Sequence, residues 1–182
     1  MFKAKRCWMT ALLVTFLCGG QPLLLAGPIK LTEGQVKAGC LYNFAQYVEW
    51  PASAFAGSNS PLVISVIGKN NFGGALEALT ERTVRKRRVV VRQISRIEEL
   101  GDSRILFIST SERGQLAHIL GLLQAQPVLT VSDIRQFTGA GGMISLVTLE
   151  DRVRFAINLK AARQADLRLS AHLLKLATSV IE

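Results

Sequence analysis

Four short runs of strand-forming residues alternate with stretches of helical spacing, and this order narrows the possible folds more than any other pattern in the chain. The runs lie at Leu62–Ile67, Arg88–Ile94, Arg104–Ser109 and Pro127–Val131. Strands that alternate with helices pair in a mainly parallel sheet, because each helix carries the chain back across one face. The pattern predicts a single α/β domain of three layers, with a Rossmann-like parallel sheet between helices.

Helical spacing predicts where the covering helices lie. A first helix is expected over Gln35–Val48, with apolar residues Val36, Cys40, Leu41, Phe44 and Val48 on its buried face. Trp50 precedes Pro51, which disfavours helix at that point and ends the segment. Ser109 and Glu112 have the spacing of a capping box before a helix with buried Leu116, Ile119, Leu120 and Leu123. Shorter helical segments are expected at Phe72–Leu79, at Ile97–Leu100 and after Asp133.

The last third of the chain departs from simple alternation. Two extended segments are predicted there, Met143–Leu149 and Arg152–Asn158. Glu150-Asp151 joins them in a tight antiparallel hairpin at one side of the sheet. Leu169, Leu173, Leu176, Ala177 and Val180 then predict one final amphipathic helix.

The amino-terminus has the order of a secretory signal. Met1–Arg6 is basic, Trp8–Cys18 is uncharged, and Gly19, Gly20 and Pro22 precede a cleavage site after Ala26. We therefore expect a signal peptide at 1–26, a linker at 27–34, a domain at 35–182 and a periplasmic product; a retained anchor is the alternative. Cleavage would leave Cys40 as the single thiol, which excludes an internal disulfide.

Composition and charge favour a folded, basic protein. Apolar residues make up 49% of the chain and charged residues 19%, which excludes general disorder, and the formal net charge is +9. Basic residues concentrate between Arg82 and Arg96. Arg85, Arg87, Arg88 and Arg92 are candidates for contact with an acidic partner, and a solvated strand edge is the competing interpretation. Aromatic residues are not interleaved there, so nucleic acid is not an expected partner.

Motifs that carry chemistry are missing from the sequence. Gly68 to Gly74 has P-loop glycine spacing, but Gly74-Ala75 replaces the Lys-Ser/Thr pair, so a turn is the preferred interpretation. There is no G-x-S-x-G or H-E-x-x-H, and His118 and His172 are isolated. We predict no enzyme activity, no cofactor and no metal. Asp133 follows a strand where α/β sheets bind ligands, although an N-cap role is favoured for it. Gly141 and Gly142 lie in a loop that needs positive φ, and are kept as possible contact residues.

Val36–Pro51, which contains Tyr42-Asn43-Phe44 and Trp50-Pro51, resembles the opening helix of the YfiR family of small secreted regulators. Ile105–Ser109, Pro127–Asp133, Gly141–Ile144, Arg152–Asn158 and Leu173–Ala177 continue the resemblance in order. The resemblance implies a periplasmic repressor that binds the sensor domain of an inner-membrane diguanylate cyclase or sensor kinase. Such a repressor lowers cyclic-di-GMP signalling and biofilm formation. It also implies a homodimer. Ala156 departs from the family pattern, where an acidic residue is expected.

Two other functions are compatible with the residues. One is a periplasmic small-molecule-binding α/β module that uses Asp133, Gly141 and Gly142. The other is an envelope protein held on anionic surfaces by the basic run. Asn43, Trp50 and Pro51 are expected to be structural: Asn43 to hydrogen-bond a neighbouring loop, and Trp50 to cover the end of the first helix.

Overall fold

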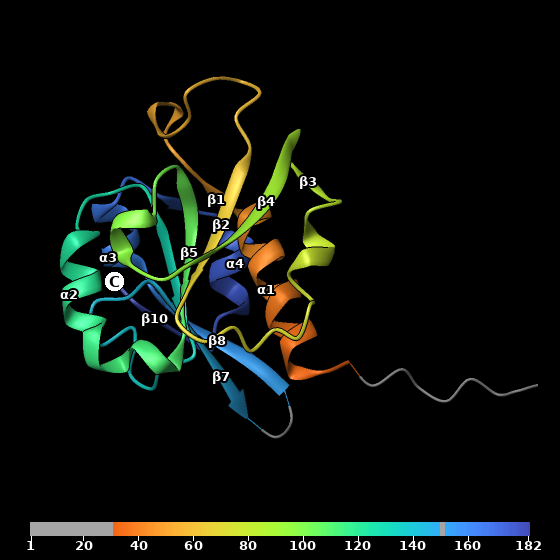
Figure 1. The fold of residues 1–182 in the computed structure, drawn as a ribbon. Coiled ribbons are helices and arrows are strands. Elements are labelled where there is room, and N and C mark those ends of the chain that lie inside the picture. The colour runs from red at the N-terminus through yellow and green to blue at the C-terminus, as the bar shows by residue number, and fades with distance from the viewer. Residues whose placement is uncertain (1–30, 150–151) are drawn as a thin grey trace, which may run out of the picture. The chain divides into compact units, whose positions relative to one another are not determined.

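The computed structural model of the protein describes residues 31–149 and 152–182, and its centre is a sheet of eight strands in the order β10-β8-β7-β6-β5-β2-β4-β3 (Figure 1). The five strands from β4 to β7 run parallel. β8 is antiparallel to β7, β10 is parallel to β8, and β3 is antiparallel to β4 at the opposite edge. The predicted α/β class, with its mainly parallel sheet and late antiparallel hairpin, is confirmed.

The four predicted strands form within two residues of their expected bounds. They are β2 (Leu62–Ile67), β4 (Arg87–Ile94), β5 (Ser103–Ile108) and β6 (Leu129–Ser132). All six residues of β2 and all four of β6 are buried. Strands covered on both faces are mainly apolar, and such runs are easily seen in a sequence. The polar exceptions, Ser65, Thr130 and Ser132, are buried with their hydroxyl groups hydrogen-bonded. The hairpin consists of β7 (Ile144–Leu149) and β8 (Arg152–Asn158), and its predicted turn at 150–151 lies outside the described residues.

Helix α1 (Glu33–Tyr47) begins two residues earlier than predicted, because Thr32 and Gln35 form a reciprocal capping box. Its buried face is also rotated from the predicted one. Gly34, Lys37, Ala38, Leu41, Phe44 and Ala45 are buried, whereas Val36 and Cys40 are only half-buried. Small residues at 34, 38 and 45 lie on this buried face, and Gly34 lets the helix backbone approach the segment that follows β2. A Cβ atom on Gly34 would lie 2.7 Å from the carbonyl oxygen of Phe72.

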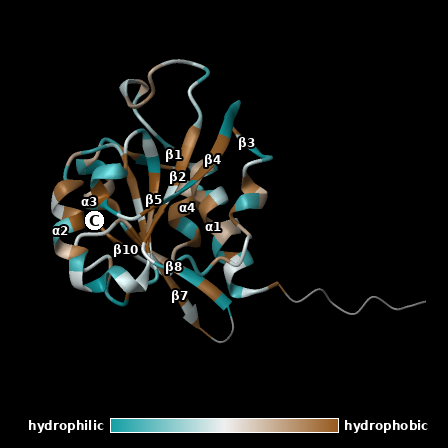
Figure 2. Cartoon of the chain, viewed as in Figure 1, coloured by the Kyte–Doolittle hydropathy of each residue, from teal (hydrophilic) through white to brown (hydrophobic). Residues whose placement is uncertain are grey.

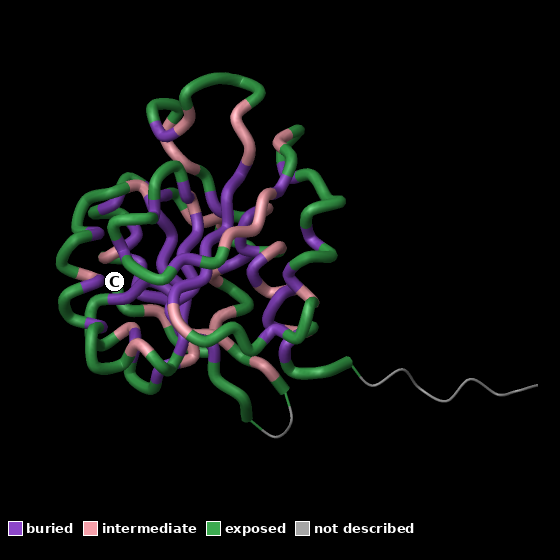
Figure 3. Tube along the Cα trace, viewed as in Figure 1, coloured by how far each residue is buried: buried purple, intermediate pink, exposed green. Residues whose placement is uncertain are grey.

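Helices cover both faces of the sheet. Apolar residues of α1, α3 (Leu159–Gln164) and α4 (Ala171–Leu176) share one core cluster, and those of α2 (Leu116–Leu122) belong to a second. Side chains alternate along β5 accordingly, since Ile105 and Phe107 join the first cluster and Leu106 and Ile108 the second. Hydrophobic residues and buried residues therefore concentrate on the central strands (Figures 2 and 3).

Several predicted helices are replaced by tighter turns. Phe72–Leu79 contains only a short 3-10 helix at Glu77–Leu79, and the predicted turn at Ile97–Leu100 is a 3-10 helix at Ile97–Glu99. The expected capping box does not form, because the Ser109 side chain makes no cap hydrogen bond and a 3-10 helix, Thr110–Gln115, precedes α2. The buried stripe of α2 is otherwise as predicted, with Leu120 half-buried.

The carboxy-terminal part differs most from prediction. The chain after β8 forms α3, a two-residue strand β9 (Arg168–Leu169), the short α4 and the edge strand β10 (Ser179–Ile181), instead of one long helix. β9 pairs with β1 (Val48–Glu49), which directly follows α1. Thr178 donates backbone and hydroxyl hydrogen bonds to the Phe155 carbonyl, so pairing with β8 ends the helical course.

Candidate functional site

Asp133 follows β6 at the carboxyl edge of the parallel strands, and its carboxylate joins two other elements. Oδ2 accepts a 2.6 Å hydrogen bond from Nζ of Lys37 on α1, and Oδ1 accepts one of 2.7 Å from the hydroxyl of Thr110. Nζ of Lys37 also lies 2.8 Å from Oε1 of Glu33, which accepts a hydrogen bond from Thr148 of β7. The group of Glu33, Lys37, Thr110 and Asp133 therefore ties α1 to the ends of β5 and β6.

The N-cap role predicted for Asp133 is wrong. The predicted short helix directly after Asp133 does not form, since residues 134–143 are turns and loop, and the Ser132 hydroxyl accepts the hydrogen bond from the Ile134 amide at 3.0 Å. Burial acts to lower the pKa of Lys37, but hydrogen bonds to Asp133 and Glu33 outweigh it and the pKa is raised. The hydrogen bond from Lys37 lowers the pKa of Glu33. Because both Asp133 oxygens are engaged within the chain, this carboxylate acts as a structural anchor.

The chain adds β4 on one side of β2 and β5 on the other, so the strand order reverses between β2 and β5. Open α/β sheets usually bind ligands at such a switch point. Here the chain itself closes the position. The Ser109 amide donates to the Ile67 carbonyl at 3.0 Å, and the Lys69 amide donates to the Ser111 hydroxyl at 2.9 Å. Gly68 has φ +86°, and a Cβ atom there would overlap the Ser111 and Glu112 side chains. Gly68 is thus a turn glycine, which agrees with the preferred interpretation of the sequence.

Gly141 and Gly142 do not join Asp133 in one site. Val131 of β6 is in register with Ile144 of β7, so Gly142 lies beside the start of β6 and Asp133 beyond its end. Gly141 has φ +101°, as the sequence predicts for this loop. Gly142 has a different role, because a Cβ atom there would overlap the ring of buried Phe137.

Most of the basic run is held within the fold. The Arg87 guanidinium donates to the carbonyls of Gly57, Ser58 and Ser60 at 2.7–3.1 Å and stacks 3.8 Å from the Phe55 ring centroid. It thereby fastens the exposed loop between Pro51 and β2, green in Figure 3. Arg85 pairs with Glu49 at 3.2 Å and Arg92 with Asp102 at 3.1 Å. Of these four arginines, only Arg88 has a side chain without a hydrogen bond or ion pair in the described part of the chain. The arginines of the basic run therefore do not form a continuous surface of unpaired positive charge.

The residues expected to be structural fall into two classes. Trp50 is half-buried against the core, and its Nε1 donates a 3.1 Å hydrogen bond to the Arg104 carbonyl. Pro51 follows it at the start of the exposed loop and precedes a 3-10 helix at Ala52–Ala54. Asn43 is exposed on α1, and its side chain forms no hydrogen bond within the described chain. The expected loop contact of Asn43 is therefore wrong.

Isolated titratable groups remain isolated in the fold. His118 is exposed on α2, and His172 packs against Tyr47 with ring centroids 5.1 Å apart. Cys40 is a free thiol whose pKa is raised by burial. Within residues 31–149 and 152–182, no three His, Cys, Asp or Glu side chains are grouped to hold a metal ion. No helix in the same ranges is long and apolar enough to cross a bilayer.

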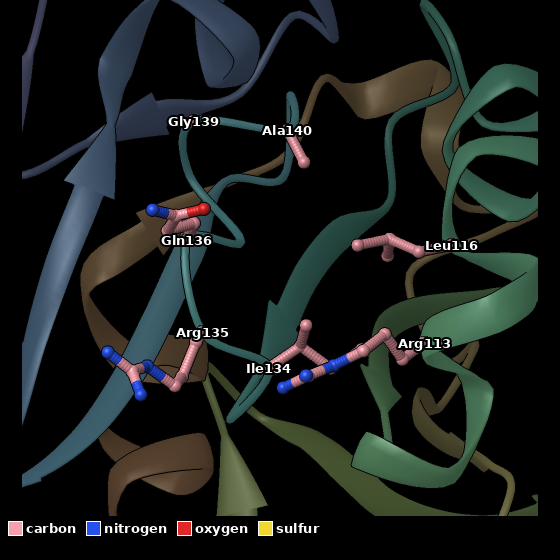
Figure 4. Close-up of a pocket in the computed structure, with 7 residues that line it drawn as sticks. All are labelled: Arg113, Leu116, Ile134, Arg135, Gln136, Gly139 and Ala140. Atoms are coloured by element: carbon pink, nitrogen blue, oxygen red, sulfur yellow. The ribbon is translucent and has the colours of Figure 1, made fainter.

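A hollow of about 800 Å³ lies between the 3-10 helix at Thr110–Gln115 and the turns that follow Asp133 (Figure 4). Its lining consists of Arg113, Leu116, Ile134, Arg135, Gln136, Gly139 and Ala140. Sequence analysis missed this feature, because Arg113 and Arg135 belong to no charge run. It also missed Lys37, since a single lysine on a helix usually marks a solvated face.

Comparison with known proteins gives one family. A family profile described as YfiR/HmsC-like matches residues 34–178. None of the curated proteins compared with the chain matches it. A conserved domain protein from Vibrio cholerae aligns with a TM-score of 0.51 and 11% identity, over 83% of this chain and 61% of that one. An ABC domain from Streptococcus pneumonia, solved with L-Trp, aligns with a TM-score of 0.49 and 11% identity, over 66% and 55%. The chain spans less than two thirds of the length of either structure. The likeness to the Vibrio cholerae protein supports the α/β fold and nothing further.

Proposed function

Because the chain belongs to the YfiR/HmsC-like family, we propose that it is a non-enzymatic periplasmic regulator of an inner-membrane signalling protein. In this proposal it binds the periplasmic sensor domain of a diguanylate cyclase, holds the enzyme inactive and lowers cyclic-di-GMP. The family is regulatory rather than catalytic. The observation that carries the proposal is the family match over residues 34–178, which includes every strand of the eight-stranded sheet except β10.

A repressor needs a surface that binds the inactive receptor better than the active one. We propose that this surface includes the outer face of the β7–β8 hairpin, which ends beside the start of α1 (Figure 1). Val147 pairs with Arg154, and Leu149 with Arg152, so these four side chains share the face opposite Leu146 and Phe155. Val147 is 39% exposed and Leu149 54%. The buried centre of a protein interface is mainly apolar and arginine is enriched at interfaces, and this face offers both.

Repression can be tested in the native host. Deletion of the gene should raise cyclic-di-GMP, and the full-length chain should restore the low level, whereas a chain without residues 1–26 should not. Crosslinking in the periplasm should capture a membrane protein with a cyclase domain. Unchanged cyclic-di-GMP together with no captured membrane protein would contradict the proposal. Amino-terminal sequencing of the periplasmic protein would test cleavage after Ala26, and light scattering would test the homodimer.

The hairpin surface needs a separate test. Val147→Asp with Leu149→Asp should abolish receptor capture while the melting temperature stays near that of the wild type. Leu122→Asp is a matched control, since Leu122 is 45% exposed on α2. Equal capture by both variants would show that the receptor binds elsewhere.

A further inference from the structure

We propose that the hollow beside Arg113 binds a small molecule that carries a phosphate-type oxyanion, with Arg113 as its principal contact. The hollow lies next to the closed position between β2 and β5, at the ends of β5 and β6 (Figure 4). This proposal does not depend on the identity of the receptor.

Charge is the first argument. The lining contains two arginines and no acidic residue. Neither guanidinium forms a hydrogen bond or ion pair within residues 31–149 and 152–182. The adjacent acids in the chain face other groups: Glu112 accepts from the Ser111 hydroxyl beside Gly68, and Asp133 is held by Lys37 and Thr110. Two positive charges without local compensation favour a dianion.

Geometry assigns unequal roles to the two arginines. Figure 4 shows the Arg113 side chain reaching across the hollow toward Ile134, whereas the Arg135 side chain extends away from it. A guanidinium presents a planar set of donors that matches the oxygens of phosphate. Arg113 therefore offers the direct contact, and Arg135 adds positive potential at the rim.

The remaining wall suits the apolar body of a ligand. Leu116 and Ile134 are buried side chains that end at the hollow. The opposite wall, residues 134–140, is fixed by hydrogen bonds of its own backbone. The Phe137 amide donates to the Ile134 carbonyl at 3.2 Å, and the Ala140 amide donates to the Gln136 carbonyl at 3.0 Å. The Asn158 side chain also donates to the Thr138 carbonyl. The volume of the hollow, about 800 Å³, is in the range of small-molecule sites. A preformed wall lowers the ordering cost of binding.

The test uses the mature chain and two probes at constant ionic strength. Calorimetric titration with glycerol 3-phosphate measures a free phosphate ester, and sedimentation with phosphatidylglycerol vesicles measures a lipid phosphate. Arg113→Gln should weaken binding of the preferred probe by about tenfold or more, as expected for a hydrogen bond to a charged group. Arg135→Gln should weaken it less. Arg88→Gln is the matched control, because it removes an exposed arginine far from the hollow, and should leave affinity within about twofold, the small effect expected from a remote exposed charge.

Each outcome decides the proposal. Saturable binding of either probe that depends on Arg113 supports it, and the probe that binds identifies the source of the phosphate. Failure of both probes to bind saturably overturns it. Equal losses in the Arg113 and Arg88 variants also overturn it, because they would indicate general attraction to a basic protein. Melting curves of the variants should match the wild type, since both arginines of the hollow are exposed.

Discussion

Lys37 and Asp133 stand 96 residues apart in the chain, yet Nζ and Oδ2 of the two side chains are 2.6 Å apart. Only 11% of the Lys37 side chain and 16% of the Asp133 side chain are exposed. Ion pairs on protein surfaces add little to stability, but removal of one partner from a largely buried pair leaves an uncompensated charge. This pair therefore holds the first turns of α1 on the sheet.

Lys37→Met should lower the free energy of unfolding by about 3 kcal/mol, because it leaves the Asp133 carboxylate with Thr110 alone. Lys175→Met removes an exposed lysine from the last turn of α4 and should change it by less than about 0.5 kcal/mol. Urea unfolding of both variants measures the difference. Equal midpoints would mean that the pair adds no stability.

Stability should depend on pH through the same group. The pKa of Glu33 is lowered from 4.5, so its contribution is present above pH 4.5 and lost as the pH falls through the folded value. The pKa of Lys37 is raised from 10.5, so its contribution is complete below pH 10.5 and lost only above that. The gap in unfolding free energy between the wild type and Lys37→Met should be widest from roughly pH 5 to 10. A gap that stays constant down to pH 3 would contradict this assignment.

Arg87 and Arg88 are neighbours of the same type with different environments, which makes them a controlled pair. Arg87→Gln should lower the free energy of unfolding by about 1.5–3 kcal/mol, because charged hydrogen bonds to the loop carbonyls are lost. Protease cleavage between residues 55 and 60 should also accelerate. Arg88→Gln should change neither quantity. Identical proteolysis of the two variants would show that Arg87 does not fasten the loop.

Two glycine-to-alanine substitutions should have opposite effects. Gly142→Ala should destabilise the protein by about 1–3 kcal/mol, because the added methyl group overlaps the buried Phe137 ring. Gly121→Ala should stabilise it by up to about 1 kcal/mol, because Gly121 lies within α2 with open space around its Cα. Thermal unfolding distinguishes them, and a stable Gly142→Ala variant would mean that Phe137 can move aside.

Trp50 contributes through both its ring and its indole N–H. Trp50→Phe removes the hydrogen bond to the Arg104 carbonyl and should reduce the free energy of unfolding by about 1 kcal/mol. Trp50→Ala also removes packing, but it should have a smaller effect than the roughly 3–5 kcal/mol of a fully buried tryptophan, because Trp50 is half-buried. Denaturant titration of both variants checks the order. Unchanged stability of Trp50→Ala would identify an exposed contact residue instead.

The central strands could be predicted because their signal is local. β2 needs mainly apolar residues on both faces, and five of the six residues of Leu62–Ile67 are apolar. The exception, Ser65, is buried with its hydroxyl hydrogen-bonded to that of Ser103. The segment from Leu169 to Val180 misled the prediction for the opposite reason. Its leucine spacing fits a helix, but backbone pairing of β10 with β8 ends α4 at Leu176. That competition is decided by contacts distant in sequence.

Site residues were harder to predict than strands. Asp133 was predicted as an N-cap or a ligand contact, but its carboxylate pairs with Lys37, which lies on a helix near the start of the chain. A clue to the true face of that helix was available, because Gly34, Ala38 and Ala45 are small residues on one side. The basic run was misleading because charge density does not reveal internal partners such as the carbonyl group of Ser60.

The pairing of β1 with β9 has a consequence for the order in which the protein can assemble. β1 directly follows α1, and β9 belongs to the last fifteen residues, where the Ser170 amide also donates to the Tyr47 carbonyl. Contacts between distant parts of a chain form late in folding. A polypeptide delivered amino-terminus first therefore cannot complete the pairing at the end of its opening helix until Arg168 and Leu169 are available, and truncation before Arg168 should leave Val48 and Glu49 open to chaperones and proteases.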